Sequence, residues 1–254
     1  MKQINLAGAL ARFTEAGKGT DPLRQNLGLH VGDDPALVHY RREALSHEVG
    51  APLLWMDQTH STEVVLIDSH TSLPTYSSIE CGPISADALV VDARGWEGAP
   101  GACVMVADCL PVLFGAEDGA VIAAAHAGRQ GLLGGILTRV VDIYKGVGID
   151  PADIEVAIGP AACAACYEVP EDMRSDAVKT HPATYGITRQ GTPSIDLVRG
   201  AEQELRRCGI MKISIDARCT IEEKTLHSHR RDPAHGRQVG VVVPFPVLRH
   251  AELP

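Results

Sequence analysis

The chain has 254 residues, of which 45% are hydrophobic and 22% charged, and this balance excludes a disordered or fibrous protein. Its formal net charge of -9 argues against nucleic-acid binding, because that function needs clustered Lys and Arg side chains to neutralise phosphates. No apolar run approaches membrane-spanning length, the N-terminus does not resemble a secretory signal, and seven scattered cysteines do not resemble a disulfide framework, so we expect a cytoplasmic protein that binds no membrane.

The first half of the chain predicts one helix followed by short strands. Asp34 and Pro35 precede apolar residues at helical spacing, and a capping acid followed by proline is typical of a helix start. Short apolar runs predict buried strands over 64–67, 88–91, 104–107 and 120–125. A turn around residues 117–119 is expected to join the last two of these strands into a hairpin.

The second half predicts further helices and strands. The expected helices cover 131–147 and 196–208, and the expected strands cover 154–158, 213–215 and 239–243. Prolines 182 and 193 interrupt the pattern over 166–194, which receives no assignment. No segment resembles a linker, so we expect one α/β (α+β) domain over residues 1–254.

Three residues predict a metal site. Cys109 follows a predicted strand, His126 ends the next one, and antiparallel pairing places a strand start beside a strand end. His60 can complete the set from another segment. One sulfur with two imidazoles suits zinc best, with copper as an alternative, and three protein ligands leave a fourth position for water or substrate. Taken singly, each residue also has a structural explanation, as a core cysteine or a surface or packed histidine.

The short sequence motifs around these residues resemble those of a known family. Seven short motifs occur in order, and they are DQTHS (57–61), SADALV (85–90), VADCLP (106–111), AAHAG (124–128), IGP (158–160), CYEV (166–169) and HRRD (229–232). Together with NLGLHVGDD at 26–34, they resemble the laccase-domain family, also called multicopper polyphenol oxidase, purine nucleoside phosphorylase or peptidoglycan editing factor.

This resemblance implies a fold, a metal and a reaction. The fold would be a single domain of mixed β-sheets flanked by helices, related to cysteine-hydrolase-like folds. The zinc ligands of the family fall on His60, Cys109 and His126. The activities would be purine nucleoside phosphorylase, methylthioadenosine phosphorylase and adenosine deaminase, with purine nucleosides and phosphate as partners. The oxidase name implies copper and phenols, but one three-ligand site cannot supply several copper centres.

Further candidates surround the ligands. Asp87 and Asp108 are expected to orient a ligand histidine or accept a proton, and Gln58 to contact substrate or metal-bound water. Phosphate needs paired donors, for which the candidates are Arg230 and Arg231, with Arg42 behind them. Each also has a structural alternative, as a turn former, a local hydrogen-bonding residue or part of a solvated basic turn.

Two features depart from a simple reading. After HAG, Arg129 and Gln130 stand where the family usually has Trp-Arg, which puts the substrate range in doubt. Cys163 and Cys166 look like a zinc or redox pair, but a structural zinc site needs a second ligand pair at similar spacing and none is obvious, so we expect a packing role.

Two other functions compete with the zinc enzyme. Cys109 as nucleophile with His126 as base would make a cysteine hydrolase or amidase, one that edits peptidoglycan precursors for example. A closed four-ligand metal site would instead make a non-enzymatic interaction module. We expect a monomer or a homodimer.

Overall fold

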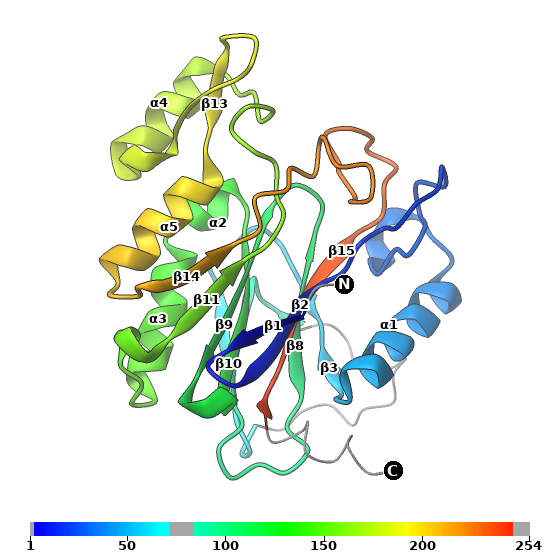
Figure 1. Ribbon diagram of the computed structural model, residues 1–254, viewed down its shortest axis with the longest axis vertical. Coiled ribbons are helices and arrows are strands. Elements are labelled where there is room, and N and C mark those ends of the chain that lie inside the picture. Colours follow the sequence, from blue (N-terminus) through cyan, green and yellow to red (C-terminus); the bar gives the residue numbers. More distant parts are fainter. Residues whose placement is uncertain (1–2, 72–83, 246–254) are drawn as a thin grey trace.

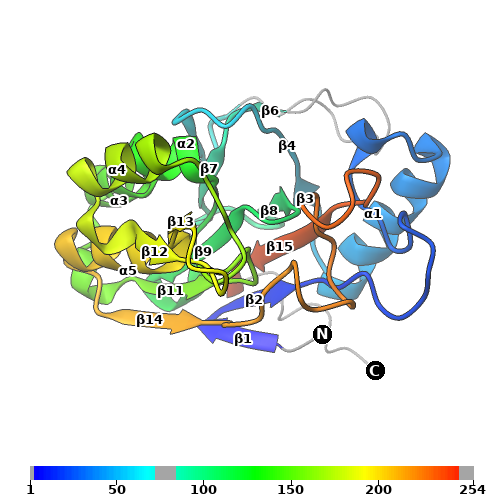
Figure 2. The same ribbon diagram turned by 90° about the horizontal axis from the view of Figure 1, so that it is seen from above.

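The computed structural model describes residues 3–71 and 84–245. Two β-sheets lie face to face, and helices cover the outer face of each sheet (Figures 1 and 2). The result is a layered α/β architecture, which confirms the expected fold class of mixed sheets flanked by helices.

The larger sheet forms the centre of the molecule and has the strand order β14-β11-β9-β10-β7-β5. Its strands are β5 (Val64–Ile67), β7 (Ala88–Asp92), β9 (Leu110–Ala116), β10 (Val121–Ala127), β11 (Glu155–Ile158) and β14 (Lys212–Ile215). The inner pairs are antiparallel, whereas the edge strands β5 and β14 are parallel to their neighbours. The inner strands β9 and β10 are buried throughout, as expected for apolar runs covered on both faces.

The smaller sheet packs against the larger one and has the order β1-β2-β15-β8-β3. Its strands are β1 (Gln3–Leu6), β2 (Ala9–Phe13), β3 (Leu53–Leu54), β8 (Gly101–Val106) and β15 (Gln238–Val243). Alternate residues of β8 serve different layers: Val104 lies between the sheets, and Met105 lies on the opposite, outer face. Two short pairs complete the strands, β4 (Met56–Asp57) with β6 (Ile84–Ser85) and β12 (Tyr185–Ile187) with β13 (Pro193–Ile195).

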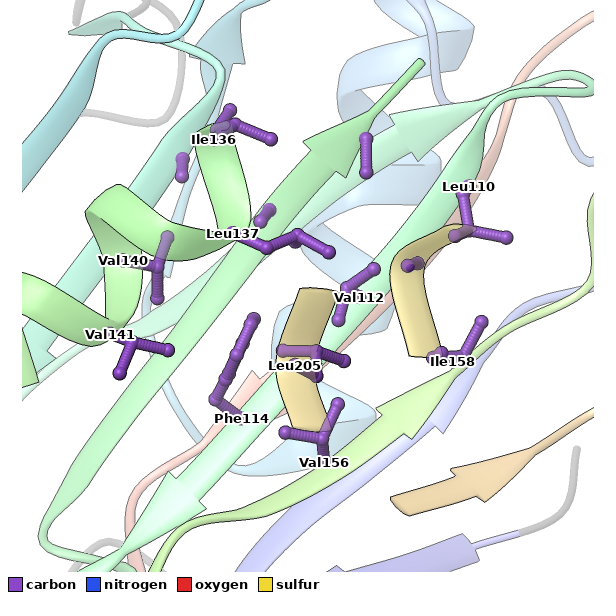
Figure 3. Packing of buried hydrophobic residues seen from close by; sticks show 14 of the residues in the cluster. Leu110, Val112, Phe114, Ile136, Leu137, Val140, Val141, Val156, Ile158 and Leu205 are labelled. Carbon is purple, nitrogen blue, oxygen red and sulfur yellow. The ribbon is translucent and has the colours of Figure 1, made fainter. Parts of the chain in front are cut away.

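Helices cover the outer faces. Those on the larger-sheet side are α2 (Arg129–Leu133), α3 (Ile136–Gly146), α4 (Glu171–Thr180) and α5 (Leu197–Arg207). Figure 3 shows Leu137 of α3 and Leu205 of α5 beside Phe114 of β9, and all three side chains are fully buried. Each such side chain stabilises the fold by about 1.5–3 kcal/mol relative to an exposed one. None of the helices in residues 3–71 and 84–245 combines the length and apolar character needed to cross a bilayer.

Helix α1 (Pro35–Val49) covers the smaller sheet and confirms the predicted start. The Asp34 carboxylate accepts a hydrogen bond from the Ala36 amide at 2.9 Å, as an N-cap residue does. The predicted strands over 64–67, 88–91, 154–158, 213–215 and 239–243 and the predicted helix over 196–208 are also present, with small shifts in their ends.

Two predictions were wrong. The hairpin around residues 117–119 joins β9 to β10, whereas β8, over 101–106, belongs to the other sheet. The predicted helix over 131–147 is two helices, because Gly135 has a φ of 84° and this left-handed conformation interrupts helical geometry between α2 and α3. The unassigned stretch 166–194 contains α4, β12 and β13.

Candidate metal centre

The three predicted ligands come together in one cluster. The ligand atoms of His60, Cys109 and His126 all lie within 4.8 Å of one another, and His60 Nε2 is 3.7 Å from Cys109 Sγ. Zinc bond lengths of 2.0–2.3 Å in a tetrahedron give ligand separations of about 3.6 Å. The donor set and the distance between His60 and Cys109 therefore fit a zinc ion. His126 is buried, Cys109 half-buried and His60 exposed, so one side of the cluster faces solvent.

The β9–β10 hairpin places two of these ligands. In its register His126 lies opposite Pro111, and Cys109 directly precedes the first residue of β9. The start of one strand thus lies beside the end of the next, as the sequence predicted, although the strand involved is β9 rather than β8. His60 reaches the cluster from the loop between β4 and β5.

Backbone conformation at the cluster is unusual. His60 has a φ of 62°, and Asp108, next to Cys109, has a φ of 87°. Residues other than glycine rarely adopt these left-handed φ values, which cost about 1–3 kcal/mol each and occur most often at functional sites. The surrounding hydrogen bonds hold both residues in these conformations.

Asp87 supplies many of those hydrogen bonds. Its fully buried carboxylate accepts from His126 Nδ1 at 2.8 Å and from the His60 amide at 3.1 Å. It also accepts from the amide and hydroxyl of Ser61 at 2.6 and 2.7 Å. With Nδ1 bonded to Asp87, the Nε2 atom of His126 is the one left for a metal, which is the carboxylate–histidine arrangement of many metal sites.

Asp87, Cys109 and His126 change one another's pKa values through hydrogen bonds and charge. Burial raises the pKa of Asp87, but hydrogen bonds from His126 and Ser61 outweigh burial and hold this pKa well below its usual range. Burial lowers the pKa of His126, yet Asp87 and the Cys109 sulfur raise it to about 9. Burial raises the pKa of Cys109, yet His126 and His60 lower it to about 6. Cys109 is therefore mainly a thiolate at neutral pH, the form that binds a metal or acts as a nucleophile.

Gly128 leaves the space in which the ligands meet. A Cβ atom added there would lie 3.0 Å from both Cys109 Sγ and His60 Cδ2 and 3.6 Å from His126 Nε2. The two contacts of 3.0 Å are tighter than ordinary van der Waals packing, so a larger residue would press on Cys109 and His60, whereas the contact with His126 would be an ordinary one. The glycine of the HAG motif is thus part of the candidate site.

The side chains of Asp108 and Gln58 form hydrogen bonds with other parts of the protein rather than with the candidate ligands. The Asp108 carboxylate accepts from the Thr220 hydroxyl and from the Arg230 amide, both at 2.6 Å. The Gln58 amide pairs with the backbone of Met105 through two hydrogen bonds of 2.8 Å. Neither contact joins these residues to the three ligands, so their catalytic and substrate roles stay predictions.

The three candidate arginines have different surroundings. Arg231 donates to the backbone carbonyls of a neighbouring loop at Thr220, Ile221, Glu223 and Leu226. Arg42 donates to the Leu27 carbonyl and lies 3.9 Å from the centroid of Trp55, and burial lowers its pKa to about 10. Arg230 is exposed and contacts the Glu168 carbonyl at 3.2 Å and the Tyr167 ring at 5.4 Å. Of the three, Arg230 has the guanidinium most available to a ligand.

Tyr167, Arg129 and Arg237 lie near the cluster and were not predicted as site residues. Burial raises the pKa of Tyr167. The positive charges of Arg129 and Arg230 lower this pKa, and the charge of Cys109 raises it. Burial lowers the pKa of Arg237, with the charges of Cys109 and Asp108 acting in the opposite sense. The position of Tyr167 inside the CYEV motif was the available signal.

Comparison with known proteins finds relatives that match most of the chain. A purine nucleoside phosphorylase of Streptomyces coelicolor is 37% identical over 92% of this chain and 95% of its own length. One of Corynebacterium glutamicum is 39% identical over 85% of each chain. The crystal structure of YlmD from Geobacillus stearothermophilus matches with a TM-score of 0.81 and 29% identity, covering 94% of this chain and 92% of that one. The Neisseria meningitidis protein NMB0706 matches with a TM-score of 0.78 and 33% identity, covering 94% and 96%.

The family itself follows from a match over most of the sequence. Residues 13–244 match the model of the family described as multi-copper polyphenol oxidoreductase laccase, and this range includes every residue of the candidate site. The chain therefore belongs to the multi-copper polyphenol oxidoreductase laccase family.

Proposed function

We propose that this protein is a zinc-dependent purine nucleoside phosphorylase that also cleaves methylthioadenosine and deaminates adenosine. The observation that carries the proposal is the convergence of His60, Cys109 and His126 at zinc-ligand spacing. The names of the curated relatives support phosphorolysis of purine nucleosides as the reaction. The substrates are then a purine nucleoside and phosphate.

The residues of the site have separable roles in this proposal. Bound zinc would supply a Lewis acid at the open face of the cluster. Asp87 keeps a proton on Nδ1 of His126 and thereby directs Nε2 toward the ion. Cys109 provides a thiolate ligand at neutral pH, because His126 and His60 lower its pKa to about 6 against the effect of burial.

Phosphate needs a cation that is free to bind it. Arg230 suits this role because its guanidinium is exposed and makes few protein contacts. Arg129, whose charge acts on Tyr167, is a second cation in the same neighbourhood. The Tyr167 ring offers a face for stacking a base. Arg231 instead holds its loop in place.

A cysteine hydrolase is the second candidate function. It is favoured by the contact of 2.8 Å between His126 and Asp87 and by the lowered pKa of the Cys109 thiol, which together resemble a Cys-His-Asp arrangement. Polyphenol oxidation by copper is the third. Within residues 3–71 and 84–245, however, only one candidate metal cluster contains imidazole ligands, and several copper centres would need more.

Metal analysis and nucleoside assays test the proposal together. Wild-type protein should release base from inosine or adenosine only when phosphate is present, and chromatography should detect ribose 1-phosphate in equal amount. Cys109→Ala should lose one equivalent of zinc and the activity. If Cys109→Ala retains its full zinc content, the proposed coordination is wrong.

Two further measurements separate the alternatives. Ammonia release without phosphate-dependent base release would restrict the reaction to deamination. Activity of metal-free protein that disappears on thiol alkylation would instead identify a cysteine hydrolase.

For phosphate binding, Arg230→Ala should raise the KM for phosphate at least tenfold, whereas Arg129→Ala measures the contribution of the second cation.

A further inference from the structure

A second cluster of metal-binding side chains lies apart from the three ligands. Cys163, Cys166, Cys219 and Glu222 each offer one ligand atom, and these atoms lie within 4.8 Å of one another. The cluster joins two segments that are more than fifty residues apart in the sequence. Its second pair of ligands is one cysteine and one carboxylate, Cys219 and Glu222, rather than two cysteines.

Two similar turns form this cluster. In the first, the amides of Cys166 and Tyr167 both donate to the Cys163 carbonyl at 2.9 Å. In the second, the amides of Glu222 and Glu223 donate to the Cys219 carbonyl at 3.2 and 2.8 Å. Each turn thus presents two ligands three positions apart in the sequence, the spacing found in structural zinc sites.

The backbone fastens the two turns side by side. Ala161 and Cys219 form a parallel bridge, and the Thr220 amide donates to the Ala161 carbonyl at 3.1 Å. The Cys163 amide points at Cys219 Sγ at 3.4 Å, a contact that stabilises negative charge on sulfur. The ligand positions are therefore fixed by main-chain contacts.

The surroundings are those of a cation site rather than of packed cysteines. Cys166 Sγ lies 3.3 Å from Glu222 Oε1, and Arg189 forms an ion pair with the same carboxylate. A carboxylate beside Cys166 adds an oxygen donor for a cation, whereas purely apolar packing of the cysteines would need none. Three thiolates and one carboxylate around a divalent ion leave a net charge of about -2, which Arg189 partly offsets.

We propose that Cys163, Cys166, Cys219 and Glu222 bind a second zinc ion whose role is structural. Four protein ligands complete a tetrahedral shell, so no position remains for substrate. Sulfur-rich donor sets select zinc over magnesium or calcium, which prefer oxygen ligands.

The proposed second site also supports the candidate active site. Residues next to its ligands hold Asp108: the Ala162 amide donates to the Asp108 carbonyl at 3.0 Å, and the Thr220 hydroxyl donates to its carboxylate at 2.6 Å. Asp108 precedes Cys109 and has a left-handed backbone. The structural zinc thus stabilises the two segments whose hydrogen bonds hold Asp108, and through Asp108 it helps to position Cys109.

Zinc counting by elemental analysis and native mass spectrometry tests this proposal on the full chain, purified under reducing conditions without a histidine tag. Wild type should contain two zinc ions. Cys109→Ala and the double variant Cys163→Ala/Cys219→Ala should each contain one, whereas the control Cys208→Ala, a half-buried cysteine of neither cluster, should contain two. One zinc in the wild type that Cys109→Ala removes would overturn the second site without touching the first.

Cobalt substitution identifies which cysteines hold the ion. Because three of the four bound thiolates belong to the second site, Cys109→Ala should retain about three quarters of the sulfur-to-cobalt charge-transfer band. The double variant should retain the smaller remainder. An unchanged charge-transfer band in the double variant would overturn the proposal.

Glu222→Gln keeps the proposal testable if the double variant does not fold. This variant should release one of its two zinc ions to a chromophoric chelator at least tenfold faster than wild type. Its neighbour Glu223→Gln is the matched control, because the Glu223 carboxylate contacts Thr225 and not the cluster. Equal release rates for both variants would exclude Glu222 as a ligand.

Discussion

Replacing Asp87 by asparagine tests how this protein positions its candidate metal ligands. The substitution keeps the shape of the side chain but removes its charge and turns one acceptor oxygen into a donor NH₂ group. At one carboxylate oxygen, the NH₂ group would face the Ser61 amide, which is 2.6 Å away. At the other oxygen it would face His126 Nδ1 and the His60 amide, at 2.8 and 3.1 Å. Either orientation opposes existing donors.

The expected effect on stability is large because Asp87 is fully buried. Hydrogen bonds to a charged group contribute about 1.5–3 kcal/mol each, and at least one is lost while another buried donor is left unsatisfied. We expect the free energy of unfolding to fall by about 3–5 kcal/mol at pH 7.5, the range for breaking a buried charged pair.

The expected effect on metal binding follows from the His126 tautomer. An NH₂ group beside Nδ1 needs an acceptor there, which moves the ring proton to Nε2 and removes the lone pair that binds the ion. Zinc affinity should therefore fall about 10- to 100-fold. Urea unfolding of metal-free protein measures the first effect, and competition with a chromophoric chelator measures the second.

Asp68→Asn is the control for this prediction. Asp68 also accepts hydrogen bonds from a backbone amide and a hydroxyl, those of His70 and Thr71, but it lies away from the ligands. It should leave both the urea midpoint and the zinc affinity close to those of the wild type, because substitutions away from buried networks change little. Should Asp87→Asn behave like Asp68→Asn in both assays, the positioning role assigned to Asp87 is refuted.

Three further predictions concern single residues. Gly128→Ala should weaken zinc binding at least tenfold in chelator competition, because its Cβ would lie 3.0 Å from Cys109 Sγ, whereas Gly146→Ala, with open space around it, should not. Burial lowers the pKa of His227 from 6.5 to about 3. Below pH 6.5 the unfolded chain therefore binds more protons than the folded protein, and the free energy of unfolding decreases as the pH is lowered, by about 2 kcal/mol at pH 5. Urea midpoints at pH 7.5 and 5 should show this loss in wild type, and an equal loss in His227→Phe would contradict it. Arg231→Ala should lower the free energy of unfolding by about 2–4 kcal/mol in urea, since it leaves several loop carbonyls without their charged donor, and an unchanged midpoint would argue against this role.

Local sequence determined many elements of the fold. The start of α1 follows from Asp34 and Pro35, which act within one turn of the helix. The strands β5, β7, β11 and β15 follow from short apolar runs, because such runs need burial whatever their neighbours are. The predicted metal ligands also came from sequence, through the motifs around them.

Strand β9 shows where local reasoning fails. Pro111 and Gly115 favour turns, so the run over 110–116 did not predict a strand. In the fold, Pro111 lies beyond the end of its partner β11, and a Cβ at position 115 would lie 2.2 Å from the Leu6 carbonyl oxygen of the other sheet. Both residues therefore suit positions that only the packed sheets create.

The sequence by itself thus determined which residue types carry the chemistry, while the tertiary structure decided which of them meet. Neighbouring Arg230 and Arg231 look alike in sequence, yet only Arg230 remains available to a ligand, because the loop carbonyls surround Arg231. The pairing of Cys163 with Cys219 likewise depends on a bridge between distant segments. Contacts of this kind arise from the path of the whole chain, so no local pattern records them.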